Sequence, residues 1–501
     1  MGEYWYDRLT ALDSSFLMLE KPHAPLHVAS TLTFEAGPLR REDGGIDAKL
    51  IQDHVAAELH RIPRYRQKIQ WVPFSSRPVW VEDDRFRLDY HVRHTSLPRP
   101  GSDEQLRRLS ARIMEQPLDL SRPLWEMWVV EGLEGDRFAL ISKIHHCMID
   151  GVSGAELLKI LLDISPDVPA DPKPARFFPR RAPSAFQLWR DETLRRAALP
   201  VELVRDVSGF FREAEERRRE VLSQFRSAAD LVGATMRLAT PTPINEPVSP
   251  HRRFDWLVME IADIKEVRRG LGGSVNDVVL ATVCGAVQRF LEHRHVSPAS
   301  VDFTVMAPVS VRKREDQEAL GNQVSAWMID LPIAETDPRE QLRRIREETT
   351  RLRTSRQAVG ATILSEAAEW SSSTLLALGA RNISRVLPCN IVVTNVPGPQ
   401  IPLYMLGARM LETYPLVPLV DNLGLGIALM SYDGKLCWGF NADYDLVPDL
   451  SVFQGFVQES FEALREAAGQ AQPVEAPPDA PGAEPPLQIV PPGRIGTGDD
   501  G

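Results

Sequence analysis

The sequence predicts an α/β (α+β) protein with mixed sheets, organised as two regions of similar character. Three observations carry this prediction. The chain has 501 residues, too many for one ordinary hydrophobic core. Short alternating runs bounded by Gly, Pro and Asn turns are typical of strands, and segments with helical spacing of apolar residues follow them. Hydrophobic residues make up 43% and charged residues 25%, as in a folded globular protein.

The first predicted region spans residues 1–168. The stretch 27–37 alternates between apolar and polar residues and ends at a Gly-Pro turn, which indicates a strand. A second strand is predicted over 136–146. The residues that follow, 152–165, have capping-box spacing at their start and one leucine-rich face, which predicts a helix. The chain between this strand and this helix should be a tight loop.

Residues 169–250 read as a proline- and arginine-rich linker followed by a helical crossover. The segment 176–226 holds 12 arginines against 8 acidic residues, although the whole chain is acidic. Two interpretations stay open: a solvated crossover between two domains, or a helix that leans on an anionic membrane or lipid-droplet surface. The apolar side chains available for the second are Phe186, Leu188, Trp189, Phe210 and Phe211.

A second region is predicted over 251–466, followed by a tail, 467–501. Residues 469–501 contain 8 Pro, 6 Gly and no aromatic residue, so we expect the tail to be disordered. In the second region the helix is expected at 276–294, and the strands are expected at 254–262, 302–311, 390–399, 423–434 and 435–443.

Charge and composition exclude several classes of function. A net charge of −11 argues against nucleic acid as a partner, because phosphate binding requires a basic surface. The four scattered cysteines indicate reduced thiols, not disulfides or a zinc site. The first residues lack the basic head and apolar run of a secretory signal, and no apolar stretch approaches the roughly 18 residues of a membrane span. We expect a cytoplasmic protein that meets lipid only from the side.

The stretch SKIHHCMIDGVSG, residues 142–154, contains the pattern HHxxxDG. His145, His146, Asp150 and Gly151 are its fixed positions, and they fall in the loop between the predicted strand and helix. A neutral imidazole can take a proton from an alcohol near pH 7, and a thioester carbonyl is a good electrophile. His146 as a general base would therefore suffice for direct acyl transfer, without a covalent enzyme intermediate.

Rival interpretations of this loop are weaker. A serine hydrolase would need a GxSxG turn, which is absent from the sequence. Cys147 is next to the proposed base, but adjacent residues at a strand end point in different directions. A metal on His145, His146 and Asp150 would lack a second ligand cluster, so we expect no metal. A packed histidine pair without any chemistry remains an alternative.

Two further side chains are candidates for supporting roles. Asp150 need not touch His146, since it can pair with an arginine and fix the loop; Arg312 is the candidate partner, or else a surface charge. The negative charge that develops on the thioester oxygen requires a donor, and Asn276 is a polar group available for a cleft. The alternative is that Ser274 or Asn276 caps the helix that follows.

At this point the chain resembles the bacterial wax ester synthase/diacylglycerol acyltransferase family. The resemblance spans roughly 8–466 and is weak over 166–240. The HHxxxDG pattern alone is shared with peptide-synthetase condensation domains; the other elements make the resemblance specific. These elements are LTALDSSFLMLE (9–20), PLDLSRPLWEMWVVEGL (117–133), KIHHCMIDGVSG (143–154), SVNDVVLATVCGAV (274–287), PVSVR (308–312), LGNQVSAWMIDLP (320–332), VTNVPGP (393–399) and SYDGKLCWGFNAD (431–443).

The resemblance implies two chloramphenicol-acetyltransferase-like domains, 1–168 and 251–466, with an active-site tunnel between them. It implies His146 as general base, positioned by His145, Asp150 and Gly151. Trp125 of the PLW element, and Asn276 and Asp277 of the ND element, become substrate-cleft candidates.

For the reaction, the resemblance implies transfer of a fatty acyl group from acyl-CoA to diacylglycerol or a long-chain alcohol. Acyl-CoA would be a co-substrate, and no cofactor is expected. A peripheral membrane or lipid-droplet surface is the expected partner. Two alternatives remain: a carrier-protein- or polyketide-associated acyltransferase of the same fold, and a non-catalytic lipid-droplet-binding protein.

Overall fold

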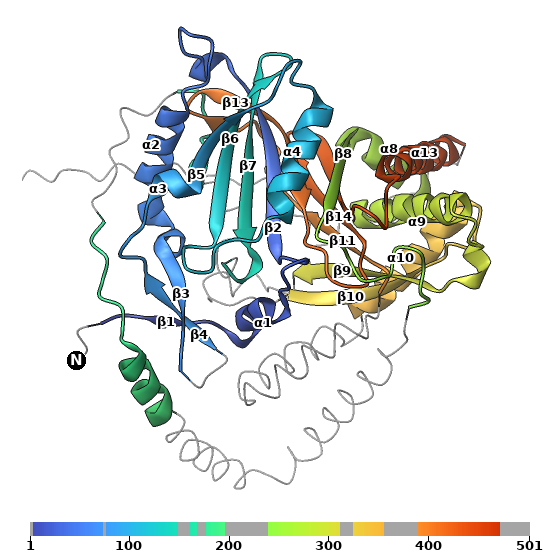
Figure 1. The fold of residues 1–501 in the computed structure, drawn as a ribbon. Coiled ribbons are helices and arrows are strands. Elements are labelled where there is room, and N and C mark those ends of the chain that lie inside the picture. The colour runs from blue at the N-terminus through green and yellow to red at the C-terminus, as the bar shows by residue number, and fades with distance from the viewer. Residues whose placement is uncertain are drawn as a thin grey trace, which may run out of the picture.

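The computed structural model describes residues 4–73, 77–148, 158–167 without 159, 177–195, 239–310, 324–354 and 389–470. Within these residues the chain forms two six-stranded sheets and one three-stranded sheet (Figure 1). Helices cover the sheets, so the prediction of a mixed α/β fold is confirmed. Asp150, Gly151, Arg312, most of the predicted helix 152–165, and the predicted tail beyond 470 lie outside the described residues.

The first region supplies most of the first sheet and all of the three-stranded one. Its elements are β1 (Asp7–Arg8), α1 (Ala11–Leu19), β2 (His27–Glu35), η1 (Gly37–Leu39), α2 (Ala48–Glu58), η2 (Leu59–Arg61), η3 (Pro63–Arg66), β3 (Gln67–Trp71), β4 (Pro78–Glu82), α3 (Leu88–His91), β5 (Val92–Ser96), α4 (Asp103–Glu115), β6 (Trp125–Leu133), β7 (Arg137–His145) and η4 (His146–Met148).

The first sheet has the strand order β12-β13-β2-β7-β6-β5. The predicted strands 27–37 and 136–146 are β2 and β7, which pair antiparallel along their full lengths. Successive side chains of β7 enter different cores, as the two-residue period of a strand requires. Phe138 and Leu140 pack with α2 on one face, whereas Ala139 and Ile141 pack with α4 on the other.

The second region supplies the second sheet, with order β10-β9-β11-β14-β15-β8. The one helix and the five strands that the sequence predicts in this region occur within a few residues of the predicted positions, as α9, β8, β9, β11, β14 and β15. The elements are β8 (Arg252–Glu260), α8 (Ile261–Leu271), α9 (Val275–His293), η5 (Pro298–Ser300), β9 (Phe303–Ser310), β10 (Val324–Leu331), α10 (Pro338–Thr354), β11 (Ile391–Val396), β12 (Tyr404–Met405), β13 (Ala408–Leu416), β14 (Leu425–Tyr432), β15 (Lys435–Asp443) and α13 (Leu450–Gly469).

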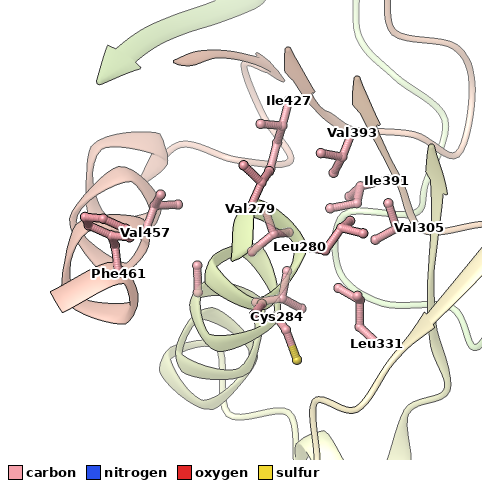
Figure 2. Close-up of a cluster of buried hydrophobic side chains, with 14 of the residues drawn as sticks. Val279, Leu280, Cys284, Val305, Leu331, Ile391, Val393, Ile427, Val457 and Phe461 are labelled. Atoms are coloured by element: carbon pink, nitrogen blue, oxygen red, sulfur yellow. The ribbon is translucent and has the colours of Figure 1, made fainter. Parts of the chain in front are cut away.

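The core of the second region lies between this sheet and helices α9 and α13. Figure 2 shows Leu280 and Cys284 of α9 facing the strand residues Val305 and Ile391, with Phe461 of α13 on the other side. Every one of these side chains is apolar or a buried thiol. Helix α9 is buried over most of its length because it packs between the sheet and α13.

Strand β13 joins the two halves. It comes from the second region but pairs antiparallel with β2 of the first sheet (Figure 1). Its other side lies close to β15: a Cβ built at Gly439 would lie 1.8 Å from the carbonyl oxygen of Pro415, so only glycine fits there. Phe254 and Trp256 of β8 pack against Tyr414 of β13 in a core shared with α4. Strand β13 thus lies in the sequence of the second predicted domain and in the sheet of the first. The predicted domain limits stay a prediction.

No single helix among the described residues is long and apolar enough to span a bilayer. Helices α8 and α9 meet the requirements of length and composition only when taken together, and a bend of 93° separates them.

Candidate active site

The histidine pair lies at the end of β7. His145 is the last residue of that strand and is paired directly with His27, the first residue of β2. The chain then turns into η4, whose first residue is His146. The backbone N–H of His146 donates to the carbonyl oxygen of Leu26 at 2.9 Å, so the pairing with the β2 side continues past the strand. The sequence predicts this position, a loop leaving a strand.

The imidazole of His146 is half-buried and has little polar compensation. Its ring stacks on that of Phe16 of α1, with centroids 3.9 Å apart and planes at 29°. Its Nδ1 atom is buried and has no hydrogen-bond partner among the described residues. Burial lowers the pKa of His146 to about 4, because a protonated ring would lose its hydration. At neutral pH this imidazole is therefore unprotonated and able to accept a proton.

His145 has a different environment and makes structural contacts. It is fully buried, and its Nδ1 accepts the backbone N–H of Cys147 at 3.1 Å. In a neutral ring that accepts at Nδ1, the proton is on Nε2, and Nε2 lies 3.5 Å from Oε1 of Glu20. His145 therefore holds the turn that carries His146 and has no open side for a substrate.

A buried positive charge lies next to the pair. Lys143 is fully buried, and its Nζ donates to the carbonyl oxygens of Ile113 and Gln116 at 2.9 Å each, at the end of α4. Glu126 is 3.6 Å from the same Nζ. Burial lowers the pKa of Lys143, and burial together with the charge of Lys143 lowers the pKa of His27 well below 6.5. His27 is thus a neutral neighbour of His145.

Cys147 follows His146 but is sealed in the first core. Burial raises the pKa of its thiol well above the usual value, and the negative charges of Asp13 and Glu20 add to this effect. The thiolate required of a nucleophile is therefore strongly disfavoured.

The other predicted site residues are distributed over the fold. Trp125 is 1% exposed; its ring stacks on His91 and its Nε1 donates to the carbonyl oxygen of Tyr65 at 2.8 Å. It is a core residue of the first region, so a part in a substrate cleft stays a prediction. Asp150, Gly151 and Arg312 lie outside the described residues, and the proposed Asp150–Arg312 pair stays a prediction as well.

The ND element lies at the start of α9. Ser274 is the N-cap and forms a capping box with Asp277, so the prediction that Ser274 caps this helix is confirmed. The other carboxylate oxygen of Asp277 accepts from Thr349 of α10 at 2.7 Å, which gives Asp277 a structural part. Asn276 is exposed, and its Oδ1 accepts from Asn395 at 2.6 Å. The ND and VTNVPGP elements therefore meet in space.

Sequence reasoning missed the residues behind the histidines: Phe16, Glu20, His27 and Lys143. A lysine inside an apolar strand was the one local signal, because such a residue is buried only when its charge has partners. The contacts of Phe16 and Glu20 come from a helix more than 120 residues away in the chain.

A cavity of about 940 Å³ lies at the other end of the first sheet, lined by Arg40, Arg99 and Arg137 among others. Arg137 begins β7 and His145 ends it, so the two are roughly 26 Å apart at about 3.3 Å per residue. The cavity is therefore separate from the histidine turn. Among the described residues no group of three His, Cys, Asp or Glu side chains could hold a metal ion.

Two family models match this chain. The wax ester synthase/diacylglycerol acyltransferase catalytic domain matches residues 9–279, and the C-terminal domain of the same family matches residues 320–465. Two Mycobacterium tuberculosis proteins named as diacylglycerol O-acyltransferases are similar over nearly their whole lengths. One, from strain CDC 1551, is 34% identical and covers 92% of this chain and 90% of its own. The other, from strain H37Rv, is 30% identical and covers 91% and 96%.

Solved structures agree with these matches. The wax ester synthase/diacylglycerol acyltransferase from Marinobacter aquaeolei VT8 superimposes with a TM-score of 0.63 at 25% identity, over 92% of this chain and all of that one. The starter condensation domain of rhizomide synthetase, solved with C8-CoA, gives a TM-score of 0.56 at 13% identity over 93% and 96%. The second likeness is one of fold alone.

Proposed function

The chain belongs to the wax ester synthase/diacylglycerol acyltransferase family, and from this premise we propose that His146 is the general base of a direct acyl transfer from acyl-CoA to diacylglycerol. The observation that carries the proposal is the place of this imidazole: it follows directly after β7, stacks on Phe16, and its Nδ1 has no hydrogen-bond partner among the described residues. Its pKa of about 4 means that the ring is neutral at pH 7, although it is a weaker base than a free imidazole. Long-chain alcohols are proposed as second acceptors, which would give wax esters.

The proposed step balances without an enzyme-bound intermediate. His146 takes the proton of the acceptor hydroxyl while the hydroxyl oxygen forms a bond to the thioester carbonyl carbon. The resulting oxyanion collapses, the carbon–sulfur bond breaks, and the CoA thiolate takes the proton from the imidazolium. Burial makes an isolated imidazolium costly, so the nearby oxyanion must compensate for it. Asn276 stays the candidate donor to that oxyanion.

The proposal requires no cofactor and no metal; acyl-CoA is a co-substrate, and nucleic acid has no part in it. Asp150 and Gly151 are proposed to shape the loop after His146, and an interdomain tunnel is proposed to admit the two lipid substrates. We place the protein in the cytoplasm, in contact with membrane or lipid droplets from one side.

Support for that contact comes from residues 185–195, which form a helix (Figure 1). Its Leu188 packs against Val79 and Val81 of β4, while Phe186, Trp189 and Leu194 are exposed. Spacings of three and eight residues put those three side chains on one broad face, opposite Leu188. A helix anchored by one face and presenting aromatic side chains on the other suits an interfacial lipid contact.

The function is tested by offering labelled palmitoyl-CoA with diacylglycerol and with hexadecanol in parallel, followed by product separation. Labelled triacylglycerol is the expected main product. Transfer only from a carrier-bound acyl chain would favour the condensation-type alternative. Lipid binding without any product, from a folded protein, would favour the non-catalytic droplet protein and contradict the proposal.

A further inference from the structure

The LTALDSSFLMLE element at 9–20 has no role in the reaction as described so far. In the structure it forms α1, which Thr10 caps at the start and Glu20 caps at the end. Of the described elements, α1 is the helix that packs against η4, the turn that carries His146. This contact raises the question of what α1 does for the histidine.

One carboxylate oxygen at the end of α1 contacts three groups around the turn. Oε1 of Glu20 lies 3.5 Å from Nε2 of His145 and 3.5 Å from Nε2 of His27; these are close polar contacts, and neither is a hydrogen bond in this geometry. The same oxygen accepts the backbone N–H of Leu26 at 3.2 Å. The Glu20 side chain is 15% exposed, so water competes little for these contacts.

Two routes lead from this oxygen to the backbone on either side of the His146 side chain. On one route, Glu20 accepts the N–H of Leu26, and the carbonyl oxygen of the same residue accepts the N–H of His146 at 2.9 Å. On the other, the imidazole of His145 faces Glu20 with Nε2 and accepts the N–H of Cys147 with Nδ1, at 3.1 Å. The peptide groups before and after His146 are therefore both fixed with reference to Glu20.

Helix α1 also touches the proposed base directly. Phe16 lies one turn before Glu20, and the N–H of Glu20 donates to the carbonyl oxygen of Phe16. The Phe16 ring covers one face of the His146 imidazole at 3.9 Å between centroids. Helix α1 thus contacts the face of the His146 ring through Phe16 and the surroundings of the turn through Glu20.

We propose that Glu20 is a positioning residue for acyl transfer, which sets the orientation of His146 through Leu26 and His145, with Phe16 holding the ring plane. The inference rests on the proposed role of His146. The proposed role depends on the position of the Glu20 side-chain oxygen, not on its negative charge, because Leu26 and His145 must both contact that oxygen.

The molecule contains a matched control. Glu131, near the end of β6, accepts the backbone N–H of Ile46 at 2.8 Å and lies 3.5 Å from Nε2 of His94, with 24% of its side chain exposed. It therefore holds a backbone N–H and a histidine as Glu20 does. Its distance along β6 from Trp125, at the histidine end of the sheet, is about 20 Å at roughly 3.3 Å per residue.

The experiment compares Glu20→Gln, Glu20→Asp and Glu20→Ala with the same three changes at Glu131, measuring kcat and KM for acyl-CoA and acceptor together with the melting temperature. Gln keeps the reach of the side chain and its oxygen but loses the charge; Asp keeps the charge but withdraws the oxygen. We expect kcat to fall by about 10- to 100-fold for Ala and about 10-fold for Asp, since small misplacement of a base is costly.

Glu20→Gln should stay within about threefold of wild type, KM should change little in all three, and the Glu131 series should leave kcat unaltered. Equal kcat in Glu20→Asp and wild type, with Gln and Ala low, would show that charge is what matters and overturn the proposal. So would an Ala variant of normal kcat. If Glu20→Ala does not fold, the Gln and Asp variants decide between these results.

Absence of acyl transfer by the wild-type protein would instead contradict the proposed function itself. Phe16→Leu supplies an independent check, because it keeps apolar volume but removes the stacked ring. We expect its kcat to fall by about 3- to 10-fold at unaltered KM. Wild-type kcat in Phe16→Leu would remove Phe16 from the proposal.

Discussion

The two large sheets each have a face covered by helices, and those faces differ in what they bury. In the second sheet the face under α9 and α13 carries Val305, Ile391, Ile427 and other apolar side chains. In the first sheet the face toward α4 continues from Ala139 and Ile141 to Lys143 and His145. Both faces are excluded from water, but of these two described faces it is the first that buries a lysine and a histidine.

This difference separates a scaffold from a site. Burying a polar group costs free energy unless partners compensate for it, so apolar residues would suit both faces equally if packing were the sole requirement. The buried residues of the first sheet that can be charged, His27, Glu126, Lys143 and His145, lie near the strand end from which His146 projects. The second sheet is built for stability, while this end of the first gives up stability for a chemically competent histidine.

Truncation in the second core should affect stability alone. Phe453 of α13 is fully buried, and its ring meets those of Phe290 and Phe440 edge-on. Phe453→Ala should lower the free energy of unfolding by about 3–5 kcal/mol, because the large cavity cannot fully collapse. In urea unfolding and kinetic assays, kcat per folded molecule should stay within about twofold of wild type. A large fall in kcat without loss of stability would contradict the scaffold role.

Removal of the buried charge in the first sheet should affect both the stability and the titration of His27. Lys143→Met leaves the carbonyl groups of Ile113 and Gln116 without their donor and Glu126 with less compensation. We expect a loss of about 2–4 kcal/mol in unfolding free energy. Since the charge of Lys143 lowers the pKa of His27, that pKa should rise in the variant, as an NMR titration would show. An unaltered His27 titration would argue against the electrostatic coupling.

Stability should also depend on pH through the buried histidines. Burial lowers the pKa of His146 to about 4 and that of His27 well below 6.5. Between the ordinary histidine pKa of about 6.5 in the unfolded chain and the lower pKa in the native protein, the unfolded chain binds protons that the native protein does not. Stability therefore rises with pH in this window and is lost as the pH falls. From pH 7 to pH 5 His146 should cost about 2 kcal/mol, and His27 should add to this loss in the same direction. His146→Ala should lose about 2 kcal/mol less than wild type over that interval; equal losses would contradict the low pKa.

The smallest effect on stability is expected on the exposed helix face at 185–195. Replacing Phe186 and Trp189 together by Ser should change unfolding free energy by less than about 0.5 kcal/mol, since both rings project into solvent. Binding to vesicles with anionic lipid should weaken by roughly tenfold. Val452→Ser, at an exposed position of α13, is the control and should leave vesicle binding unaltered. Unaltered binding in the double variant would move the lipid contact elsewhere.

The sequence was informative where structure is local. Alternation predicts β2, an apolar run predicts β7, the local sequence predicts the helix α9, and HHxxxDG points to a turn at the end of a strand. The pairing of β13 with β2 joins segments almost 400 residues apart in the chain, and no local pattern encodes it. The cluster around Glu20 was missed for the same reason. Trp125 was a cleft candidate only through its motif, and the structure shows why a large ring at that place packs in the core.

The central claim is that His146 removes the acceptor proton, and the most direct test is the rate of triacylglycerol formation by folded His146→Ala. We expect kcat to fall by about 10² to 10⁴, equivalent to roughly 3–5.5 kcal/mol of transition-state stabilisation, with the melting temperature little changed at neutral pH. A folded His146→Ala protein that forms triacylglycerol at the wild-type rate would contradict the claim.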